Sequence, residues 1–291
     1  MTKTLKGKDN YLFLINDSSK SLKKHIDNTV NLPSPHIIKK KYNILNNPQT
    51  PFLIVFPDKE VICKDFLPDN IKINYRKHLE SYKSVFGEKI LDPTNILKPS
   101  DYYKTDTHIN NKGALKVFKV FLNFLNRKFK VNLEYENIEL HKIETDSLSK
   151  LNKCVGDLTW DINRQDTILN DISDIYYKFP PDIDFYMTTY MKNDQSFKIL
   201  DYNFNDISDK HVNNVIDWNL VSDNIFYKKT DTFQINKKVV IFYDSFLLSS
   251  IGLYKNLFKE IYFIKNSFNS CLLKKINPDF VFEFRVERFL I

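Results

Sequence analysis

The fold expected for this chain rests on the stretch VVIFYDSF, which occupies residues 239–246. Its first four residues are apolar and mostly β-branched, which is typical of a buried strand in a parallel sheet. The run stops at Asp244 and Ser245, so the strand delivers a serine to a sharp turn. A serine hydroxyl at such a turn is a candidate nucleophile for acyl chemistry, although a serine there can also simply cap the following helix.

Strands and helices alternate after this stretch. We expect a helix through Leu257, a strand at 261–264, a helix over 268–276 and a strand at 280–284. Such alternation predicts a mainly parallel sheet that is covered by helices on both faces. Ligands of such sheets bind beyond the carboxyl ends of the strands, which is where Ser245 is placed.

The first half of the chain shows the same alternation. Apolar or periodic runs predict strands at 11–15, 52–56 and 90–91, and helices at 18–28, at 75–86 and from about residue 110 to 125. Residues 31–51 contain four prolines, so we expect a loop or lid there.

The second informative stretch is TDTH at residues 105–108, directly before an amphipathic helix pattern. It places Asp106 and His108 two residues apart. With Ser245 they would supply a nucleophile, a base and an orienting acid, the three parts of serine-based acyl chemistry. The simpler alternative is that Asp106 and Thr107 only cap the helix.

The composition is that of a globular protein with a basic surface. Hydrophobic residues make up 42% of the chain and charged residues 27%, which disfavours disorder. The net charge of +7 permits an anionic partner. The positive charges are dispersed, with small lysine clusters such as 23–24 and 39–41. Because no stripe of arginines with interleaved aromatics is present, nucleic acid is not the expected partner.

The sequence gives no sign of a metal or cofactor site. The cysteines are odd in number and unevenly spaced (Cys63, Cys154 and Cys271), which fits neither a disulfide framework nor a zinc site. The histidines other than His108 form no spaced cluster (His25, His36, His78, His141 and His211). We therefore expect no metal and no cofactor.

No targeting or membrane-spanning segment is visible. The basic first residues are not followed by an apolar signal region, and no run of ~20 apolar residues could form a transmembrane helix. We therefore expect a cytoplasmic protein, unless the chain is a domain of a larger one.

Residues 130–236 are rich in Asp, Asn and Tyr and lack long periods. We expect one domain over residues 1–291, in which 130–236 is an insertion or a cleft-forming segment. Loops on a rigid sheet often carry specificity, and such side chains suit sugars through stacking and hydrogen bonds. The segment is predicted to form one wall of the cleft over Ser245, with side chains such as Tyr177, Asp182, Asp184, Tyr186, Tyr190 and Asn193.

Several short segments form one ordered pattern that runs nearly from end to end. They are GKDNYLF at 7–13, FPDK at 56–59, YKTDTHIN at 103–110 with Gly113-Ala114, GDL at 156–158, YDSF at 243–246, and the pairs 278–279 and 287–288. The pattern resembles the SGNH-hydrolase-like proteins of the alginate O-acetyltransferase group, which acetylate bacterial exopolysaccharides. The resemblance implies a three-layer α/β/α sandwich, with Ser245 as nucleophile and His108 and Asp106 completing a triad.

The resemblance also draws attention to residues around this triad. The amide of Ser245, joined by that of Gly156, would hold the oxyanion, although Gly156 and Asp157 also fit a tight turn. Asn110 either holds the histidine loop or contacts substrate. Lys59 is either a solvated lysine after its strand or points toward the site.

The chain departs from the family pattern at two positions. Tyr243 stands beside Asp244 where the family usually has Gly, which tolerates backbone angles that Tyr does not. Ile109 stands where the family usually has Trp, so an aromatic surface at the site is missing. The family is typically exported, whereas no export signal is visible here.

The function implied is serine-dependent O-acetyl transfer to a sugar of a surface polysaccharide, or removal of such an ester, because both reactions use the same triad. The acyl donor is not identified and could be a partner protein. One alternative is a non-catalytic carbohydrate-binding or assembly protein that keeps the fold. Another is a transferase of a phosphorus-containing group to a capsule sugar, although no phosphate-binding glycine loop supports it.

Overall fold

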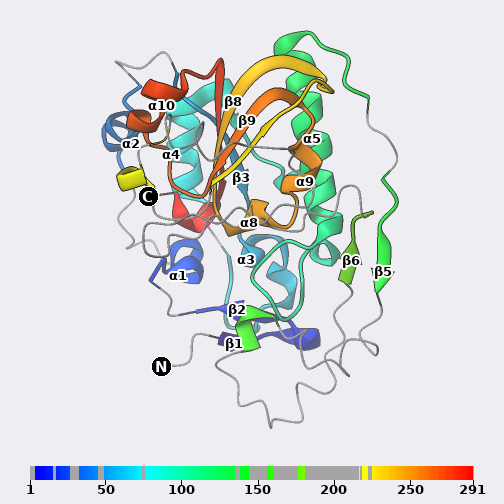
Figure 1. The fold of residues 1–291 in the computed structure, drawn as a ribbon. Coiled ribbons are helices and arrows are strands. Elements are labelled where there is room, and N and C mark those ends of the chain that lie inside the picture. Colours follow the sequence, from blue (N-terminus) through cyan, green and yellow to red (C-terminus); the bar gives the residue numbers. More distant parts are fainter. Residues whose placement is uncertain are drawn as a thin grey trace.

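A six-stranded mixed sheet runs through the centre of the molecule (Figure 1). Its order is β4–β3–β10–β8–β9–β7, and neighbouring strands are parallel except for the antiparallel pair β9–β7. The strands are β3 (Phe52–Phe56), β4 (Ile90–Leu91), β7 (Ile225–Lys229), β8 (Ile235–Tyr243), β9 (Phe258–Ile264) and β10 (Phe280–Val286). This computed structural model describes residues 4–15, 18–26, 33–44, 49–73, 76–134, 138–143, 156–159, 176–180, 216, 218–221 and 225–290. The α/β class with a mainly parallel sheet is confirmed.

The central strands are buried on both faces, which explains their uninterrupted apolar sequences. All five residues of β3 are buried, and so are the last five residues of β8. Along β8 the side chains alternate, because Ile241 joins the core on one face of the sheet while Val240 and Phe242 join the core on the other. A strand with one wet face would instead show polar residues at every second position.

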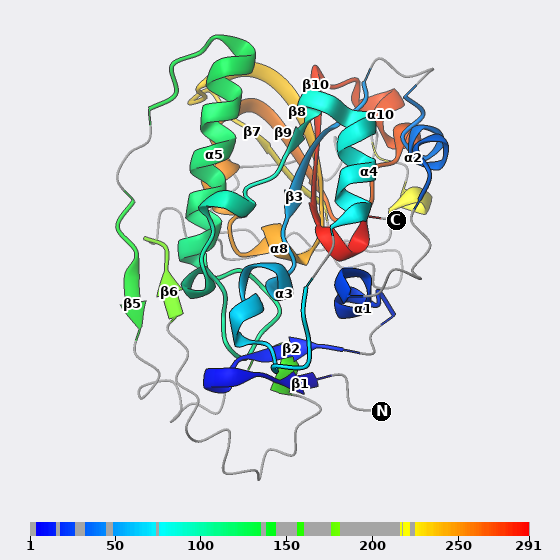
Figure 2. The same ribbon diagram turned by 180° about the vertical axis from the view of Figure 1, so that it is seen from behind.

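Helices lie on both faces of the sheet, as the two opposite views show (Figures 1 and 2). The apolar side of α5 (Asn111–Phe129) packs into the same core as α8 (Ser245–Leu248) and α9 (Ile251–Tyr254). The core on the other face takes side chains from α2 (Pro35–Lys41), α4 (Lys77–Phe86) and α10 (Ser270–Ile276). No helix within the described ranges combines the length and apolar character needed to cross a membrane.

The remaining elements lie outside the main sheet. They are β1 (Thr4–Lys6), β2 (Leu12–Leu14), α1 (Ser21–Ile26), α3 (Lys59–Ile62), β5 (His141–Ile143) and β6 (Tyr176–Lys178). β1 pairs antiparallel with β2, and β5 with β6, as two separate two-stranded sheets. The strand expected at 11–15 therefore exists as β2, but it does not belong to the central sheet.

The loop or lid predicted for 31–51 is wrong over α2. The side chain of Ser34 accepts a hydrogen bond from the amide of Ile37, and Pro35 occupies the first turn. A serine cap followed by proline is a favourable helix start, because proline lacks only an N–H that the first turn leaves unpaired. Four prolines in residues 31–51 therefore do not exclude a helix, because Pro35 stands in the first turn of one.

The helix expected from Ser245 through Leu257 is also interrupted. It forms the two short helices α8 and α9, with Ser250 between them. The Ser250 hydroxyl donates to the carbonyl of Leu247 at 3.0 Å. A serine that bonds to the preceding turn competes with the helical backbone ladder, which accounts for the break.

The segment 130–236 is described only in part. Its last portion contributes β7, the antiparallel edge strand of the central sheet. Of the side chains predicted to form a cleft wall, Tyr177 lies in β6, and the others lie outside the described residues (Asp182, Asp184, Tyr186, Tyr190 and Asn193). The role of this segment in selecting the acceptor stays a prediction.

The docking of α5 on the sheet gives a test of the packing. Phe121 is fully buried, and its ring lies 5.2–5.4 Å from the rings of Tyr254, Phe282 and Phe284. We expect Phe121→Ala to lower the free energy of unfolding by about 3–5 kcal/mol, through lost burial and a residual cavity. Urea unfolding followed by circular dichroism measures this loss.

The control for this test is Ile37→Ala, at an exposed apolar position on α2. It should change the unfolding free energy by no more than about 0.5 kcal/mol. Similar losses for the two variants would contradict the packing described for α5.

Candidate active site

Ser245, His108 and Asp106 lie in one hydrogen-bonded row at the carboxyl end of β8. The distance from His108 Nε2 to Ser245 Oγ is 2.9 Å, and from His108 Nδ1 to Asp106 Oδ1 it is 2.6 Å. The carboxylate can only accept, so Nδ1 carries the proton and Nε2 is left to accept the serine hydroxyl. The hydrogen bond expected between Ser245 and His108 is present, although the two residues are 137 positions apart in sequence.

Asp106 is held in its ionised form by the loop that it belongs to. Burial favours the neutral acid, but the ring and amide of His108 and the amide of Asp157 donate to the carboxylate and lower its pKa to about 2. An anion at this position keeps the imidazole of His108 in one orientation and tautomer. It also stabilises an imidazolium, which is what a base beside a serine becomes after taking its proton.

Asp157 holds the same loop in place through hydrogen bonds to Thr107. Its carboxylate accepts the amide of Thr107 at 2.8 Å and the Thr107 hydroxyl at 2.7 Å. It also lies 3.7 Å from Nδ1 of His108, so it is a second acid beside the base. The alternative that Asp106 and Thr107 merely cap α5 does not fit, since both bond within this loop.

Gly156 has a structural role that corrects the prediction of an oxyanion donor. Its amide already donates to Thr105 Oγ1 at 3.2 Å. A side chain at this position would collide with the carbonyl of Thr105 and the side chain of Asp106. Glycine is therefore required by the close approach of two backbones.

Lys59 holds the backbone of the Asp106 loop through hydrogen bonds. Its ammonium group donates to the carbonyls of Leu12, Lys104 and Asp106 at 2.7, 2.8 and 3.0 Å. The residue is almost fully buried, and these carbonyls supply the acceptors that a buried ammonium needs. Lys59 is thus neither a solvated lysine nor directed at Ser245, and it fixes the backbone of the Asp106 loop.

Asn110 and Ile109 lead from this loop into α5. The Asn110 side chain caps the helix by accepting from the amide of Gly113, and it donates to the carbonyl of Ser100. Of the two alternatives for Asn110, the structure favours holding the loop. Ile109 is buried against Gly113, so the site has no aromatic surface at this position.

Asp244 and Tyr243 shape the turn before Ser245. The carboxylate of Asp244 accepts the amides of Phe246 and Val286 at 3.0 and 2.7 Å, so Asp244 is the helix cap and Ser245 is not. Burial raises the pKa of Asp244 despite these bonds. Tyr243 ends β8 with its side chain in the core, and it is not among the described residues with positive φ. The turn therefore accepts a tyrosine without a left-handed backbone.

Sequence analysis gave no role to the aromatic and charged groups behind the site, although Phe246, Asp58 and Arg288 lie within the segments of the ordered pattern. The ring of Phe246 lies 4.8 Å from the ring of His108, and the guanidinium of Arg288 lies over Phe246 at 5.0 Å. Arg288 donates to Asp58 at 2.9 Å, and Asp58 also bonds to His25 at 3.0 Å. The available signal was their position, since charged residues follow the buried strands β3 and β10.

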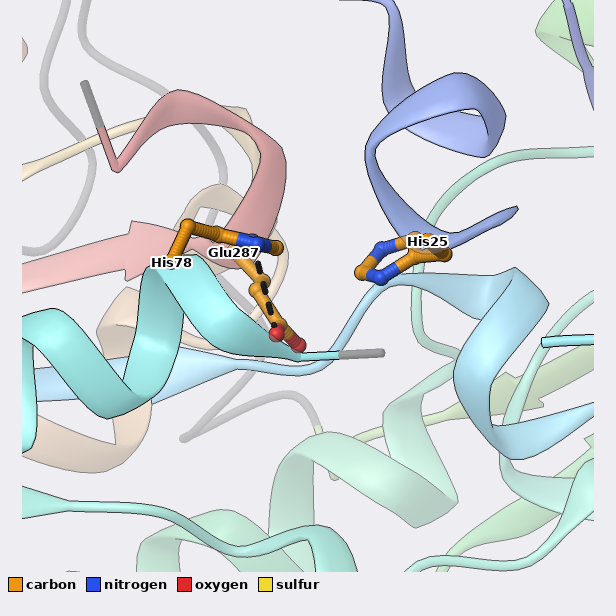
Figure 3. A group of neighbouring side chains, drawn as sticks. All are labelled: His25, His78 and Glu287. Atoms are coloured by element: carbon orange, nitrogen blue, oxygen red, sulfur yellow. Dashed lines mark ion pairs between the residues drawn. The ribbon is translucent and has the colours of Figure 1, made fainter. Parts of the chain in front are cut away.

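His25, His78 and Glu287 form a buried cluster, shown in Figure 3. The histidines form no spaced cluster in the sequence, but the fold brings His25 and His78 together from positions that are far apart in the chain. Their potential ligand atoms lie within 4.8 Å of one another. Both oxygens of Glu287, however, already accept bonds from Arg76 at 2.7–3.0 Å.

The charges of this cluster balance without a further cation. Burial lowers the pKa of His25, but its bond to Asp58 and the nearby carboxylates outweigh that effect and raise the pKa to about 9. A protonated imidazole cannot ligate a metal. Burial, the neighbouring His25 and other nearby cations lower the pKa of His78 to about 3, which keeps His78 neutral. The arrangement is that of an ionic network, and the expected absence of a metal stays a prediction.

A pocket of about 420 Å³ opens beside the serine. It is lined by Ser245 together with Lys265, Asn266, Ser267, Arg285 and Phe289. These residues come from the carboxyl ends of β8, β9 and β10, where the topology of an α/β sheet places ligands.

No family model matches the sequence. No curated protein matches it either. Among solved structures, PatB1 from Bacillus cereus aligns with 99% of this chain and 96% of its own, at 14% identity and a TM-score of 0.63. A PatB1 structure with a sulfonyl adduct aligns at 12% identity over 99% and 97% of the two chains, with a TM-score of 0.60.

A DHHW family protein from Eubacterium siraeum aligns with 99% of this chain and 95% of its own, at 15% identity and a TM-score of 0.57. These identities show a shared fold and no more. The resemblance to SGNH-like proteins inferred from the sequence is confirmed at that level.

The buried ionic network gives a pH test. His25 holds its proton up to a pKa of about 9 when folded, against about 6.5 when unfolded. Its contribution to stability is therefore complete below pH ~6.5 and is lost as pH rises through 9. We expect the unfolding free energy to fall over this range, by roughly 3 kcal/mol at most, in urea titrations between pH 6.5 and 9.5.

Two histidine variants separate this effect from general alkaline instability. His25→Gln should flatten the pH slope, whereas His36→Gln, at an exposed position on α2, should keep it. If His25→Gln is as pH-dependent as wild type, His25 does not carry the proton.

Proposed function

We propose that this protein is a serine-dependent enzyme of O-acyl chemistry, which transfers an acetyl group to a hydroxyl of a bacterial surface polysaccharide or removes it. The observation that carries the proposal is the row Ser245–His108–Asp106, with both hydrogen bonds at 2.6–2.9 Å. The half-buried serine lies beside a pocket at the carboxyl edge of the sheet. The three-layer α/β/α sandwich of the SGNH hydrolases is part of the same proposal.

The proposed reaction begins with proton transfer from Ser245 Oγ to His108 Nε2. The oxygen attacks the acyl carbonyl, and the negative charge of the tetrahedral intermediate develops on the former carbonyl oxygen. The amide of Ser245 is the first of α8, so the helix itself gives it no partner and it can donate to this oxyanion. One such donor is typically worth about 3–4 kcal/mol of transition-state stabilisation.

The intermediate then collapses to an acyl-serine. The bond from the carbonyl carbon to the leaving oxygen breaks, and His108 returns its proton to that oxygen. In the second half, His108 takes a proton from the acceptor hydroxyl, whose oxygen attacks the acyl-serine. Ser245 leaves as the alcohol with the proton from His108, and the acyl ester remains on the acceptor. With water as acceptor the same steps are hydrolysis.

The arrangement argues against a purely structural role for the serine. Asp244 caps α8, so the hydroxyl of Ser245 is not needed for capping and bonds instead to a base that is itself oriented by an acid. A loop that fixes Asp106 through Lys59 and Asp157 adds the rigid support that a catalytic geometry requires. A non-catalytic carbohydrate-binding protein would not need this support.

Replacement of the serine tests covalent catalysis. We expect Ser245→Ala to hydrolyse p-nitrophenyl acetate about 10³-fold more slowly than wild type or slower still, because the acyl group has no oxygen to bond to. The matched control is Ser249→Ala, an exposed serine at the end of α8, which should keep the wild-type rate.

A chemical label tests independently whether Ser245 is the nucleophile. Because a sulfonyl adduct is known for PatB1, a sulfonyl fluoride is a suitable probe here. Peptide mass spectrometry should find the label on Ser245 in wild type and in Ser249→Ala. Equal hydrolysis by wild type and Ser245→Ala, with no label on Ser245, would favour the non-catalytic alternative.

Replacing the two carboxylates near His108 should lower kcat to different extents. Asp106→Asn should lower kcat by about 10²-fold or more, because an amide cannot hold the imidazole tautomer or balance its charge as a carboxylate does. Asp157→Asn should cost less than about tenfold, since its carboxylate lies 3.7 Å from the ring and mainly bonds to Thr107. Stopped-flow kinetics on folded variants compares them, and a larger loss for Asp157→Asn would reverse the assignment.

A further inference from the structure

The imidazole of His108 is held by hydrogen bonds at its edge, but these bonds do not fix the tilt of its plane. Nδ1 donates to Asp106 at 2.6 Å, and Nε2 accepts from Ser245 at 2.9 Å. A rotation about the line through the two nitrogens stretches neither bond strongly. The side chain of His108 is also 29% exposed, so burial alone does not fix it. A contact from outside the plane of the ring is therefore needed to hold the tilt.

Phe246 supplies such a contact. Its ring centre lies 4.8 Å from that of His108 with the two planes inclined by 42°, so the rings pack obliquely, within the distance range of aromatic pairs. Phe246 directly follows Ser245 at the start of α8. This turn therefore contacts the imidazole twice, through the hydroxyl of Ser245 and through the ring of Phe246. A movement of α8 relative to the base would disturb both contacts together.

The ring of Phe246 is itself held by buried groups. Phe246 is only 1% exposed, and its ring lies 5.8 Å from that of Phe56 at the end of β3. The guanidinium of Arg288 lies 5.0 Å from the ring centre, an arrangement in which the face of the ring attracts the cation. A displacement of Phe246 would break both contacts inside a close-packed core.

Arg288 cannot leave the ring without disturbing a buried ion pair. Its Nη1 donates to Asp58 at 2.9 Å, and Asp58 also accepts from His25 at 3.0 Å. All three residues are buried, and separating one charge from such a group is strongly unfavourable. The ionic network that follows β3 and β10 is thus connected to His108 through the ring of Phe246.

We infer that Phe246 is a positioning residue, which holds the imidazole of His108 at the tilt that directs Nε2 at Ser245 Oγ, and that Arg288 holds the ring of Phe246 in turn. This inference rests on the proposed function, in which His108 moves the proton of Ser245. Phe246 contacts neither the acyl group nor the acceptor in that reaction, so its loss should slow the chemistry without weakening substrate binding. A misplacement of about 1 Å can cost about 10²-fold in rate.

Two variants remove the aromatic ring, Phe246→Leu and Phe246→Met. We expect each to lower kcat for p-nitrophenyl acetate by about tenfold or more and to change KM by less than about twofold. The matched control is Phe258→Leu, at a fully buried position where β9 begins, which is the edge of the sheet opposite to Ser245. It should keep kcat within about twofold of wild type. Circular dichroism confirms that each variant is folded.

Arg288→Lys tests the support behind the ring while Phe246 stays unchanged. The lysine keeps a cation for Asp58 but has no flat guanidinium to cover the ring. We expect kcat to fall by about threefold or more, less than in Phe246→Leu, with KM unchanged. A wild-type kcat in folded Arg288→Lys would overturn the role of Arg288.

A spectroscopic measurement reports the position of His108 without turnover. Its Nδ1 proton lies in the 2.6 Å hydrogen bond to Asp106, and such protons resonate far downfield in NMR spectra when the ring is held and exchange with water is slow. Because His25 bonds to Asp58 and can give a similar signal, the signal of His108 is identified by its loss in Asp106→Asn. It should be sharp in wild type and Phe258→Leu, and broadened or absent in Phe246→Leu.

Four results would overturn the inference. They are a wild-type kcat in the folded Phe246 variants, a loss confined to KM, an equal loss of kcat in Phe258→Leu, and a His108 signal in Phe246→Leu as sharp as in wild type. Failure of the proposed function has a different signature, namely equal ester hydrolysis by wild type and Ser245→Ala. The NMR signal tests the position of His108 in that case too.

Discussion

The position of β10 between β3 and β8 fixes the groups around the candidate active site. In this register Val286 lies beside Phe56, so β10 and β3 end at the same level, whereas Tyr243 lies beside Phe284, so β8 ends two residues earlier. Asp244 and Glu287 follow their strands directly and Asp58 follows β3 after one residue, and their charges must be satisfied in a buried environment. The bond from the amide of Val286 to Asp244 ties the serine turn to the neighbouring strand.

The loop that carries Asp106 and His108 is rigid for a different reason. It has little regular structure, and its backbone is held by side chains from distant parts of the chain. Lys59 donates to the loop carbonyls of Lys104 and Asp106 and also to that of Leu12 in β2, and Asp157 accepts from the amide and hydroxyl of Thr107. A buried ammonium without acceptors would be strongly unfavourable, so the loop and Lys59 stabilise each other. The base is thereby placed at hydrogen-bonding distance from a serine on another element.

Two carboxylates close to the serine illustrate how environment sets the role of an acid. Asp244 is buried and Asp106 is half-buried, and removal from water favours the neutral form of each. The donors around Asp106 outweigh burial and hold its pKa low, whereas burial prevails at Asp244 and its pKa is raised. Asp106 therefore acts electrostatically on His108, while Asp244 acts as a structural acceptor. Behind them Arg288 connects the ionic network to Phe246, whose ring lies against His108.

The sequence by itself determined the α/β class, the central strands and the residues of the hydrogen-bonded row. Buried parallel strands are continuous apolar runs, and the acid and base lie close together in sequence, so these signals are local. The helix α2 and the break after Leu248 were missed because capping and side-chain competition decide them residue by residue. Only the tertiary structure decided that Gly156 and Lys59 support the loop, that His25 and His78 meet, and that Lys265, Arg285 and Phe289 line one pocket. These contacts join residues that are far apart in the chain, and strand order and register, which set those distances, are not encoded in any single segment.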